Sequence, residues 1–489
     1  MIHLILSLLA VGLLLAWILT AIWHVYKPIP DGLDVATPWV PAAEVTFLAD
    51  TSYLTEGGER GGEQAIFDAV FDMITAADRL LVLDMFLFNN FAGTAETVDY
   101  RPLSQELGQA LVQQRHRHPD MEMLLITDPV NTVYGSLAPD HLQQLQAAGV
   151  PVIQTDLSRL RDSNPLWSGL WRLCCRWLDT EPGKGWLPNP MTGPPVSLVS
   201  WMRLLNFKAN HRKTIIANHG EEWIGLVTSA NPHDASSRHD NVALRFVGPA
   251  ALDLLATEQS ASAIRAITRS NRNAKVAFEM PASSSDARES HAGHEGHMRI
   301  LTEAQIRVAS IELIDASQPG EQLDLAMFYL SHRGVIKALK RAAARGVAVR
   351  ALLDANHDAF GREKSGLPNR PVGMELQQAD IKVRWCLTSG EQCHTKLLMR
   401  RQADGSGTLL LGSANFTRRN LDNFNMETNV EWQAPAGHPA SEAAANHFER
   451  RWNNDDGERH SLPFADYADD SWWRYWRYRL MEATGLSTF

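Results

Sequence analysis

The hydrophobic pattern of the chain begins with one long apolar run. Residues 4–23 (LILSLLAVGLLLAWILTAIW) carry no formal charge, and a helix of this length reaches about 30 Å, the thickness of a bilayer core. A cleaved signal peptide would have a basic start and small residues at its cleavage site, whereas Ala21-Ile22-Trp23-His24 is bulky. A buried core helix is seldom followed by a segment such as 27–32 (KPIPDG). We therefore predict a transmembrane anchor over 1–27 and a linker over 28–60.

Beyond the linker, one pattern of apolar and amphipathic segments occurs twice. Each copy consists of a short apolar strand, an amphipathic helix and a second apolar strand. The three segments are 79–88, 103–114 and 121–127 in the first copy, and 322–330, 334–344 and 347–353 in the second. Strand, helix and strand in succession imply βαβ crossovers. We expect an α/β fold of two fused halves with mostly parallel sheets that share one active site.

A polar stretch rich in small residues, 281–297, separates the two copies. Its histidines, His291, His294 and His297, could bind a metal, but a solvated loop is the simpler interpretation. We predict a linker here and no metal site. The halves then cover residues 61–280 and 298–489, and the first half contains a Trp-rich insertion at 164–206.

Each half carries a His-x-Lys motif followed by a Ser-Ala-Asn sequence. On a strand, the His and the Lys of such a motif share one face, because alternate residues point the same way. The Asn follows the His by 20 residues in the first copy and by 21 in the second, as expected for a hairpin that returns to the same edge. Two matched copies predict one composite site, with these residues: His211, Lys213, Ser229, Asn231, His394, Lys396, Ser413 and Asn415.

These residue types suit phosphodiester chemistry without a metal or cofactor. One imidazole can attack phosphorus and form a covalent intermediate, while the other protonates the leaving oxygen. Two ammonium groups and two amides can hold the phosphoryl oxygens as charge builds in the transition state. Both motifs are therefore needed for one site. Since one chain supplies both, catalysis should not require an oligomer.

The paired motifs resemble the HxKxxxxD and GSxN signatures of the phospholipase D superfamily and, more narrowly, those of bacterial cardiolipin synthases. The resemblance covers residues 60–435. Two positions depart from the pattern: Asn218 and Arg401 stand where the motif has Asp. The first copy also has Thr228 where the second has Gly412.

The resemblance implies a role for each site residue. His211 would be the nucleophile and His394 the general acid and base, with Ser229 and Ser413 near the substrate. In the family, a carboxylate that follows the GSxN segment of the opposite half orients each catalytic histidine. Glu427 and Asp240 are the matching residues here.

Composition narrows the substrate. A formal net charge of −10 argues against a general DNA-binding protein, which needs clustered Lys and Arg.

Four cysteines are too few for a disulfide framework. Cys386 and Cys393 could form a bridge, although two free thiols are the simpler interpretation.

Two Trp/Arg-rich segments favour a lipid substrate, namely 166–178 (LWSGLWRLCCRWL) and 472–479 (WWRYWRYR). Each suits either an interfacial helix or a Trp-rich core helix. Together with the anchor they favour a single-pass protein of the cell (inner) membrane that acts on phospholipid and not on nucleic acid. The family resemblance implies a phosphatidyltransferase of the cardiolipin synthase type acting on phosphatidylglycerol. A hydrolytic phospholipase D and a membrane-tethered nuclease remain the alternatives.

Overall fold

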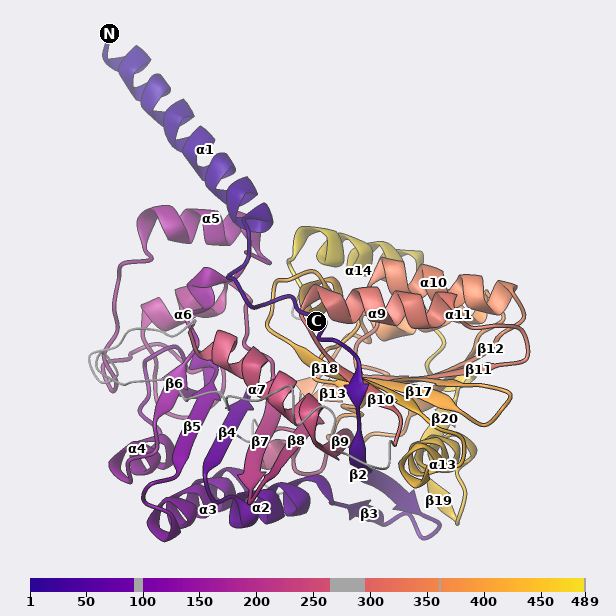
Figure 1. The fold of residues 1–489 in the computed structure, drawn as a ribbon. Coiled ribbons are helices and arrows are strands. Elements are labelled where there is room, and N and C mark those ends of the chain that lie inside the picture. Colours follow the sequence, from indigo (N-terminus) through magenta and orange to yellow (C-terminus); the bar gives the residue numbers. More distant parts are fainter. Residues whose placement is uncertain (92–99, 264–294, 360–361, 488–489) are drawn as a thin grey trace.

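The computed structural model describes residues 1–91, 100–263, 295–359 and 362–487. Helix α1 (Ile2–Tyr26) projects from a body made of two α/β halves (Figure 1). It is long and apolar enough to cross a membrane, with a mean hydropathy of 2.6 and 6% of its most apolar window buried. The predicted anchor therefore forms a helix, and most of its apolar side chains are exposed.

Each half contains a nine-stranded sheet. The first sheet has the order β19 (Glu458–Arg459), β2 (Ala43–Thr55), β9 (Asn241–Val247), β8 (Glu222–Thr228), β7 (Lys213–His219), β4 (Leu80–Met85), β5 (Glu122–Thr127) and β6 (Val152–Gln154), with β3 (Arg60–Glu63) paired to β2. The second has the order β1 (Val40–Pro41), β10 (His297–Thr302), β18 (Thr428–Ala434), β17 (Gly407–Gly412), β16 (Lys396–Arg401), β11 (Gln322–Met327), β12 (Ala348–Leu353), β15 (Lys382–Cys386) and β20 (Ser461–Pro463).

The predicted α/β class and the two βαβ units are confirmed, but the expectation of mostly parallel sheets is wrong. Only β4, β5 and β6 are parallel neighbours in the first half, and only β11, β12 and β15 in the second. The strands that carry the His-x-Lys motifs, β7 and β16, form hairpins with β8 and β17, and these pairs are antiparallel. A hairpin connection reverses the chain, so the motif strands and their return strands add antiparallel pairs to each parallel unit.

Helices pack against the faces of both sheets. They are α2 (Ile66–Ala76), α3 (Leu103–Arg117), α4 (Asp140–Ala147), α5 (Pro165–Cys174), α6 (Leu198–Leu204) and α7 (Pro249–Ser262) in the first half, and α9 (Ala304–Asp315), α10 (Arg333–Ala344), α11 (Asn369–Gln377), α12 (Arg418–Leu421), α13 (Pro439–Asn453) and α14 (Trp472–Thr484) in the second. A short hairpin, β13 (Asp358–Ala359) with β14 (Arg362–Glu363), lies apart from the main sheets. A central apolar cluster joins the halves through buried residues of both sheets, among them Ile216, Leu244, Leu397 and Trp432.

The predicted domain boundaries need correction, because strands lie inside both segments that were assigned as linkers. Residues 43–55 of the first linker form β2, which lies between β9 and β19 in the first sheet. His297 of the second linker is the first residue of β10, while residues 281–294 lie outside the described part of the chain. The ends of the chain also cross over, since β1 joins the second sheet and β19 joins the first. The halves are therefore interlocked.

Candidate active site

Two buried carboxylates hold the His-x-Lys segments at the ends of the parallel strands. Asp128 follows β5, and its Oδ2 accepts a hydrogen bond of 2.7 Å from the backbone N–H of Asn210. Asp354 follows β12, and its Oδ2 accepts one of 2.9 Å from the backbone N–H of Cys393. Each donor directly precedes its motif histidine. The two halves therefore hold their motifs through equivalent hydrogen bonds.

The motif lysines are buried and bonded in matching ways. Lys213 Nζ donates a 2.7 Å hydrogen bond to the carbonyl oxygen of His211, and Lys396 Nζ donates an equal bond to that of His394. Each ammonium also lies about 5 Å from an aromatic ring, 4.9 Å from the centre of Phe86 in the first half and 5.1 Å from that of Phe328 in the second. Neither lysine has a carboxylate within ion-pair distance among the described residues. Both retain the capacity to bind an anion.

His211 takes its orientation from the opposite half, as the family resemblance implied. Its Nδ1 lies 3.0 Å from Glu427 Oε2, and its backbone N–H donates a 2.9 Å hydrogen bond to the carbonyl of Met426. Glu427 Oε2 also accepts a hydrogen bond from the hydroxyl of Ser413, and Oε1 accepts one from the amide of Asn420. The carboxylate oxygen accepts a hydrogen bond from Nδ1, so the proton of the neutral ring resides on Nδ1. The lone pair of Nε2 is then available for attack on a substrate.

The partner of His394 is Asn241, and the assignment of Asp240 to this role is wrong. His394 Nδ1 lies 3.1 Å from Asn241 Oδ1. The hydroxyl of Ser229 donates a 3.0 Å hydrogen bond to the same oxygen, just as Ser413 bonds Glu427 in the other half. Asn241 therefore has the same contacts beside His394 that Glu427 has beside His211. One histidine faces a carboxylate and the other faces a neutral amide.

Asp240 is turned away from the imidazoles into a buried ion pair. Its Oδ2 contacts Arg451 Nη2 at 2.5 Å, and its Oδ1 accepts hydrogen bonds from the backbone and hydroxyl of Ser52. Neighbouring residues alternate in direction along an extended chain, so only one of Asp240 and Asn241 can face His394. Asp240 faces the buried guanidinium of Arg451, because this guanidinium would be a costly unpaired charge without a carboxylate beside it. Asn241 is therefore the residue that faces His394.

Burial and the repulsion between neighbouring cations lower the pKa values of the motif histidines and lysines. Burial lowers the pKa of His211 to about 4, with a further contribution from the charges of Lys213 and Lys396. The pKa of His394 is also well below its usual value, first through burial and then through Lys396. Burial lowers the pKa of Lys213 to about 7. The lysine of each half thus affects the histidine of the other, so both motifs belong to one electrostatic site.

Comparison with known proteins shows what the chain is similar to. Residues 310–452 match the family model described as cardiolipin synthase, PLD-like domain. The phosphatidylserine synthase of Haemophilus influenzae Rd KW20 has a similar structure, with a TM-score of 0.52 and 10% identity over 91% of this chain and 94% of that one. The family match covers a segment of the second half, and the structural similarity to the synthase, at 10% identity, shows a shared fold.

Two further comparisons complete the picture. Nuc, a phospholipase D family member from Salmonella typhimurium, aligns with a TM-score of 0.26 and 21% identity over 33% of this chain and 97% of that one. No curated protein matches the chain. The structural match to the synthase covers 91% of this chain, so the two proteins share a fold across both halves.

The Asn residues of the two SAN sequences are buried beside the motifs. Asn231 Oδ1 accepts a 3.3 Å hydrogen bond from the backbone N–H of Leu87, which directly follows Phe86. Asn415 Oδ1 is buried and has no hydrogen-bond partner in the described part of the chain. A buried amide oxygen without a partner is costly unless a ligand satisfies it. Asn415 is therefore suited to bind a substrate donor such as a hydroxyl group.

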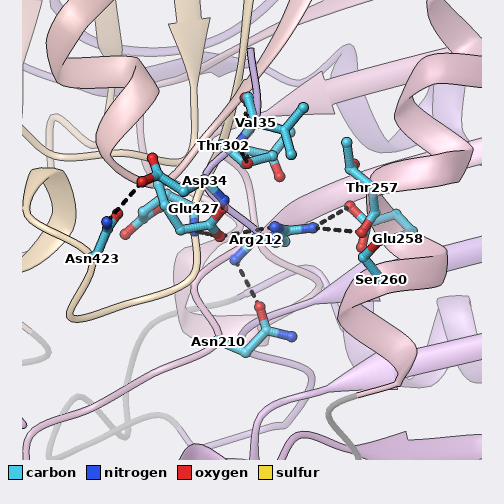
Figure 2. Close-up of polar contacts among 12 residues, drawn as sticks. Asp34, Val35, Asn210, Arg212, Thr257, Glu258, Ser260, Thr302, Asn423 and Glu427 are labelled. Atoms are coloured by element: carbon cyan, nitrogen blue, oxygen red, sulfur yellow. Dashed lines mark hydrogen bonds and ion pairs between the residues drawn. The ribbon is translucent and has the colours of Figure 1, made fainter. Parts of the chain in front are cut away.

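A network behind the first motif was missed by the sequence analysis. The guanidinium of Arg212 contacts Glu303 Oε1 at 2.8 Å and Glu258 Oε1 at 3.5 Å. In Figure 2 the Arg212 side chain lies between Glu258 on one side and Glu427 with Asp34 on the other. Glu303 joins these groups, because it accepts hydrogen bonds from the backbone N–H of both Glu427 and Asp34. Asp34 belongs to the segment that follows α1, so this segment is linked through Glu303 to Glu427, which orients His211.

The two departures from the superfamily motif have different substitutes. Asn218 stands in the first Asp position, and its Oδ1 accepts a 2.7 Å hydrogen bond from Arg79 Nε. Arg401 stands in the second, and its Nη2 contacts Asp324 at 2.8 Å and Glu449 at 2.7 Å. Both positions lie on motif strands at a distance from the imidazoles along the chain. The Asn218–Arg79 hydrogen bond and the ion pairs of Arg401 therefore take the place of contacts that the motif Asp residues would make.

The cysteines are bonded, contrary to the interpretation as free thiols. Disulfides join Cys386 to Cys393 and Cys174 to Cys175. The first closes the loop that leads into His394, and the sulfur of Cys393 lies 3.0 Å from Arg451 Nη2. This bridge and the Asp240–Arg451 pair pack together directly behind the second motif.

Proposed function

We propose that this protein is a phosphatidyltransferase of the cardiolipin synthase type. It would move a phosphatidyl group from one phosphatidylglycerol molecule to the hydroxyl of another through a phosphohistidine intermediate on His211. The observation that carries the proposal is the unequal pairing of the two buried imidazoles, His211 with Glu427 and His394 with Asn241. The family model that matches residues 310–452 and the exposed apolar helix α1 support a phospholipid as the substrate.

In the first step, His211 Nε2 attacks the phosphorus of the donor. The new N–P bond forms as the bond to the glycerol oxygen breaks, and His394 in its protonated form gives a proton to that oxygen. Glu427 stabilises the positive charge that develops on the His211 ring. Binding of the anionic phosphodiester raises the pKa of His394 from its low value in the free protein, because a nearby negative charge favours the imidazolium.

In the second step, neutral His394 removes a proton from the hydroxyl of the acceptor lipid. The acceptor oxygen attacks phosphorus, the N–P bond breaks, and the electron pair returns to His211 Nε2. Lys213, Lys396, Asn231 and Asn415 would stabilise the phosphoryl oxygens in both steps. No net oxidation or hydrolysis occurs, and glycerol is the released product.

A hydrolytic phospholipase D shares every residue of this mechanism, with water as the acceptor. Purified protein is therefore incubated with phosphatidylglycerol labelled in the diacylglycerol part, and the products are separated. Cardiolipin and free glycerol are expected. Phosphatidic acid as the main product would replace the proposal with a hydrolase, and cleavage of single-stranded DNA with intact lipid would replace it with a nuclease.

A further inference from the structure

Three segments that are far apart in sequence meet at one place on the surface. The C-terminal end of α1 contacts the start of the Trp-rich insertion, where the backbone N–H of Asp162 donates a 2.9 Å hydrogen bond to the carbonyl of His24. The C-cap residue of α14, Gly485, lies against the carbonyl oxygen of Ser163, so closely that a Cβ on Gly485 would not fit. α1, α5 and α14 thus meet at residues 162–163, and Figure 1 places α5 and α14 on the side of the body from which α1 leaves.

α5 packs closely against α1 over the last turns of that helix. A Cβ on Gly169 would lie 3.1 Å from both Ala21 Cβ and Trp17 Cδ1, so the absence of a side chain allows the contact. Trp17 Nε1 donates a 2.8 Å hydrogen bond to the carbonyl of Leu166. Ala21 lies five residues before the end of α1, or about 8 Å along a helix. Interfacial helices are embedded to a depth of about 5–10 Å, so a membrane that contains α1 also contains the outer face of α5.

α5, the residues that follow it and α14 carry large apolar side chains that are exposed. The structure leaves 57% of Leu166, 64% of Trp177, 61% of Trp472 and 77% of Trp473 exposed. Leu170, Leu173, Trp476 and Leu480 are exposed as well. Monomeric soluble proteins rarely expose a contiguous apolar patch of this kind, and Trp favours the headgroup level of a bilayer. The exposed Arg176, Arg474 and Arg477 stand among these residues, where lipid phosphates would attract them.

Short hydrogen-bonded links connect this surface to both catalytic motifs. Ser163 Oγ donates a 2.7 Å hydrogen bond to the carbonyl of Phe207, four residues before His211. Glu482 of α14 accepts a 2.7 Å hydrogen bond from the backbone N–H of Arg418, three residues after Asn415. A cavity of about 1060 Å³ lies beneath α5, and Trp171, Trp177, Arg203 and Lys208 are among the residues that line it. The charged side chains of the lining are of both signs, with Arg176, Arg203 and Lys208 beside Asp156, Asp179 and Glu181.

From these contacts we infer that α1, α5 and α14 form one membrane-embedded platform. The three helices would place the first motif and the second Asn at a fixed height below the headgroups of an anionic bilayer. α1 alone would only tether the protein, whereas the platform orients the whole body relative to its substrate. The inference concerns the surface and does not depend on which phospholipid reaction the site performs.

Photolabelling of the full-length protein tests the platform without reference to activity. The protein is reconstituted into phosphatidylglycerol-containing vesicles with a phospholipid that carries a diazirine in its acyl chain, and labelled peptides are identified by mass spectrometry. Adducts are expected in 2–26, 166–178 and 472–480. Helix α3, at the opposite end of the body, is the internal control (Figure 1). Adducts confined to 2–26 would overturn the inference.

A pair of fold-neutral variants provides a second test. Leu170→Gln with Leu173→Gln, and separately Trp472→Gln with Trp473→Gln, change only exposed side chains. Each pair is expected to lower activity on vesicles by about tenfold while activity on detergent-dispersed lipid changes less than about twofold, because only the vesicle assay requires docking. Equal losses in both assays, or no loss on vesicles, would refute a docking role.

Discussion

Replacement of Glu427 by Gln isolates the electrostatic part of the proposed mechanism. The two side chains have the same shape, but the variant loses the negative charge beside His211 Nδ1. Burial already holds the pKa of His211 at about 4, so the ring stays neutral at pH 7 in both proteins. A change in rate therefore reports stabilisation of the charged ring during N–P bond formation and not protonation of the free nucleophile.

The contacts set the size of the effect. A hydrogen bond to a charged group is worth about 1.5–3 kcal/mol, and each 1.4 kcal/mol corresponds to about tenfold in rate. Formation of phosphohistidine should therefore slow by roughly 10- to 100-fold. Glu427 also accepts from Ser413 and Asn420 through different oxygens, and a Gln amide places a donor against one of these donors. An unsatisfied buried group costs about 1–3 kcal/mol, so the melting temperature should also fall.

Rapid quench into base, where the N–P bond survives, measures the intermediate with lipid labelled at phosphorus. The matched control is Asn241→Asp, which places a carboxylate at the equivalent position beside His394. This control should raise the pKa of His394 and move the pH profile towards higher pH, with a smaller effect on the first step at pH 7. Phosphohistidine formation at the wild-type rate in Glu427→Gln would refute the assigned role of this carboxylate.

Four further outcomes are expected. His211→Ala and His394→Ala should each lower turnover by roughly 10³-fold with the fold intact by circular dichroism, and near-wild-type activity of either would exclude the two-motif site. Activity should survive EDTA, because Lys213 and Lys396 supply positive charge; complete loss restored by one divalent ion would contradict this chemistry. The protein should take up protons when it binds short-chain phosphatidylglycerol, because the pKa values of His394 and Lys396 are low in the free protein and the bound anion raises them. Calorimetry in buffers of different ionisation enthalpy measures the proton uptake. Zero uptake would contradict this prediction. The Nε and Nη2 atoms of Arg419 are buried and have no hydrogen-bond partner among the described residues. Arg419→Met should therefore raise KM for anionic lipid more than it lowers kcat. Unchanged kinetics would exclude a role of Arg419 in substrate binding.

Periodicity and spacing in the sequence determined the elements and the motif copies. The short apolar runs became β4, β5, β11 and β12 within a few residues of the predicted limits, because a buried strand is a local pattern. The interval from each motif histidine to its Asn predicted the hairpins β7–β8 and β16–β17. These features depend on neighbours along the chain, and so a single sequence carries them.

The tertiary structure alone decided which residues face one another. Glu427 is 216 positions from His211, and Asn241 is 153 from His394, so no local pattern could select Asn241 over the adjacent Asp240. The choice belongs to Arg451, whose buried guanidinium draws Asp240 away. The exposure of the Trp-rich helices was also undetermined, since the same amphipathic composition suits a core or an interface. In the structure, α5 packs against α1 through Gly169, and its large apolar side chains remain exposed. Which face of a helix is buried depends on the whole fold and not on the sequence of that helix alone.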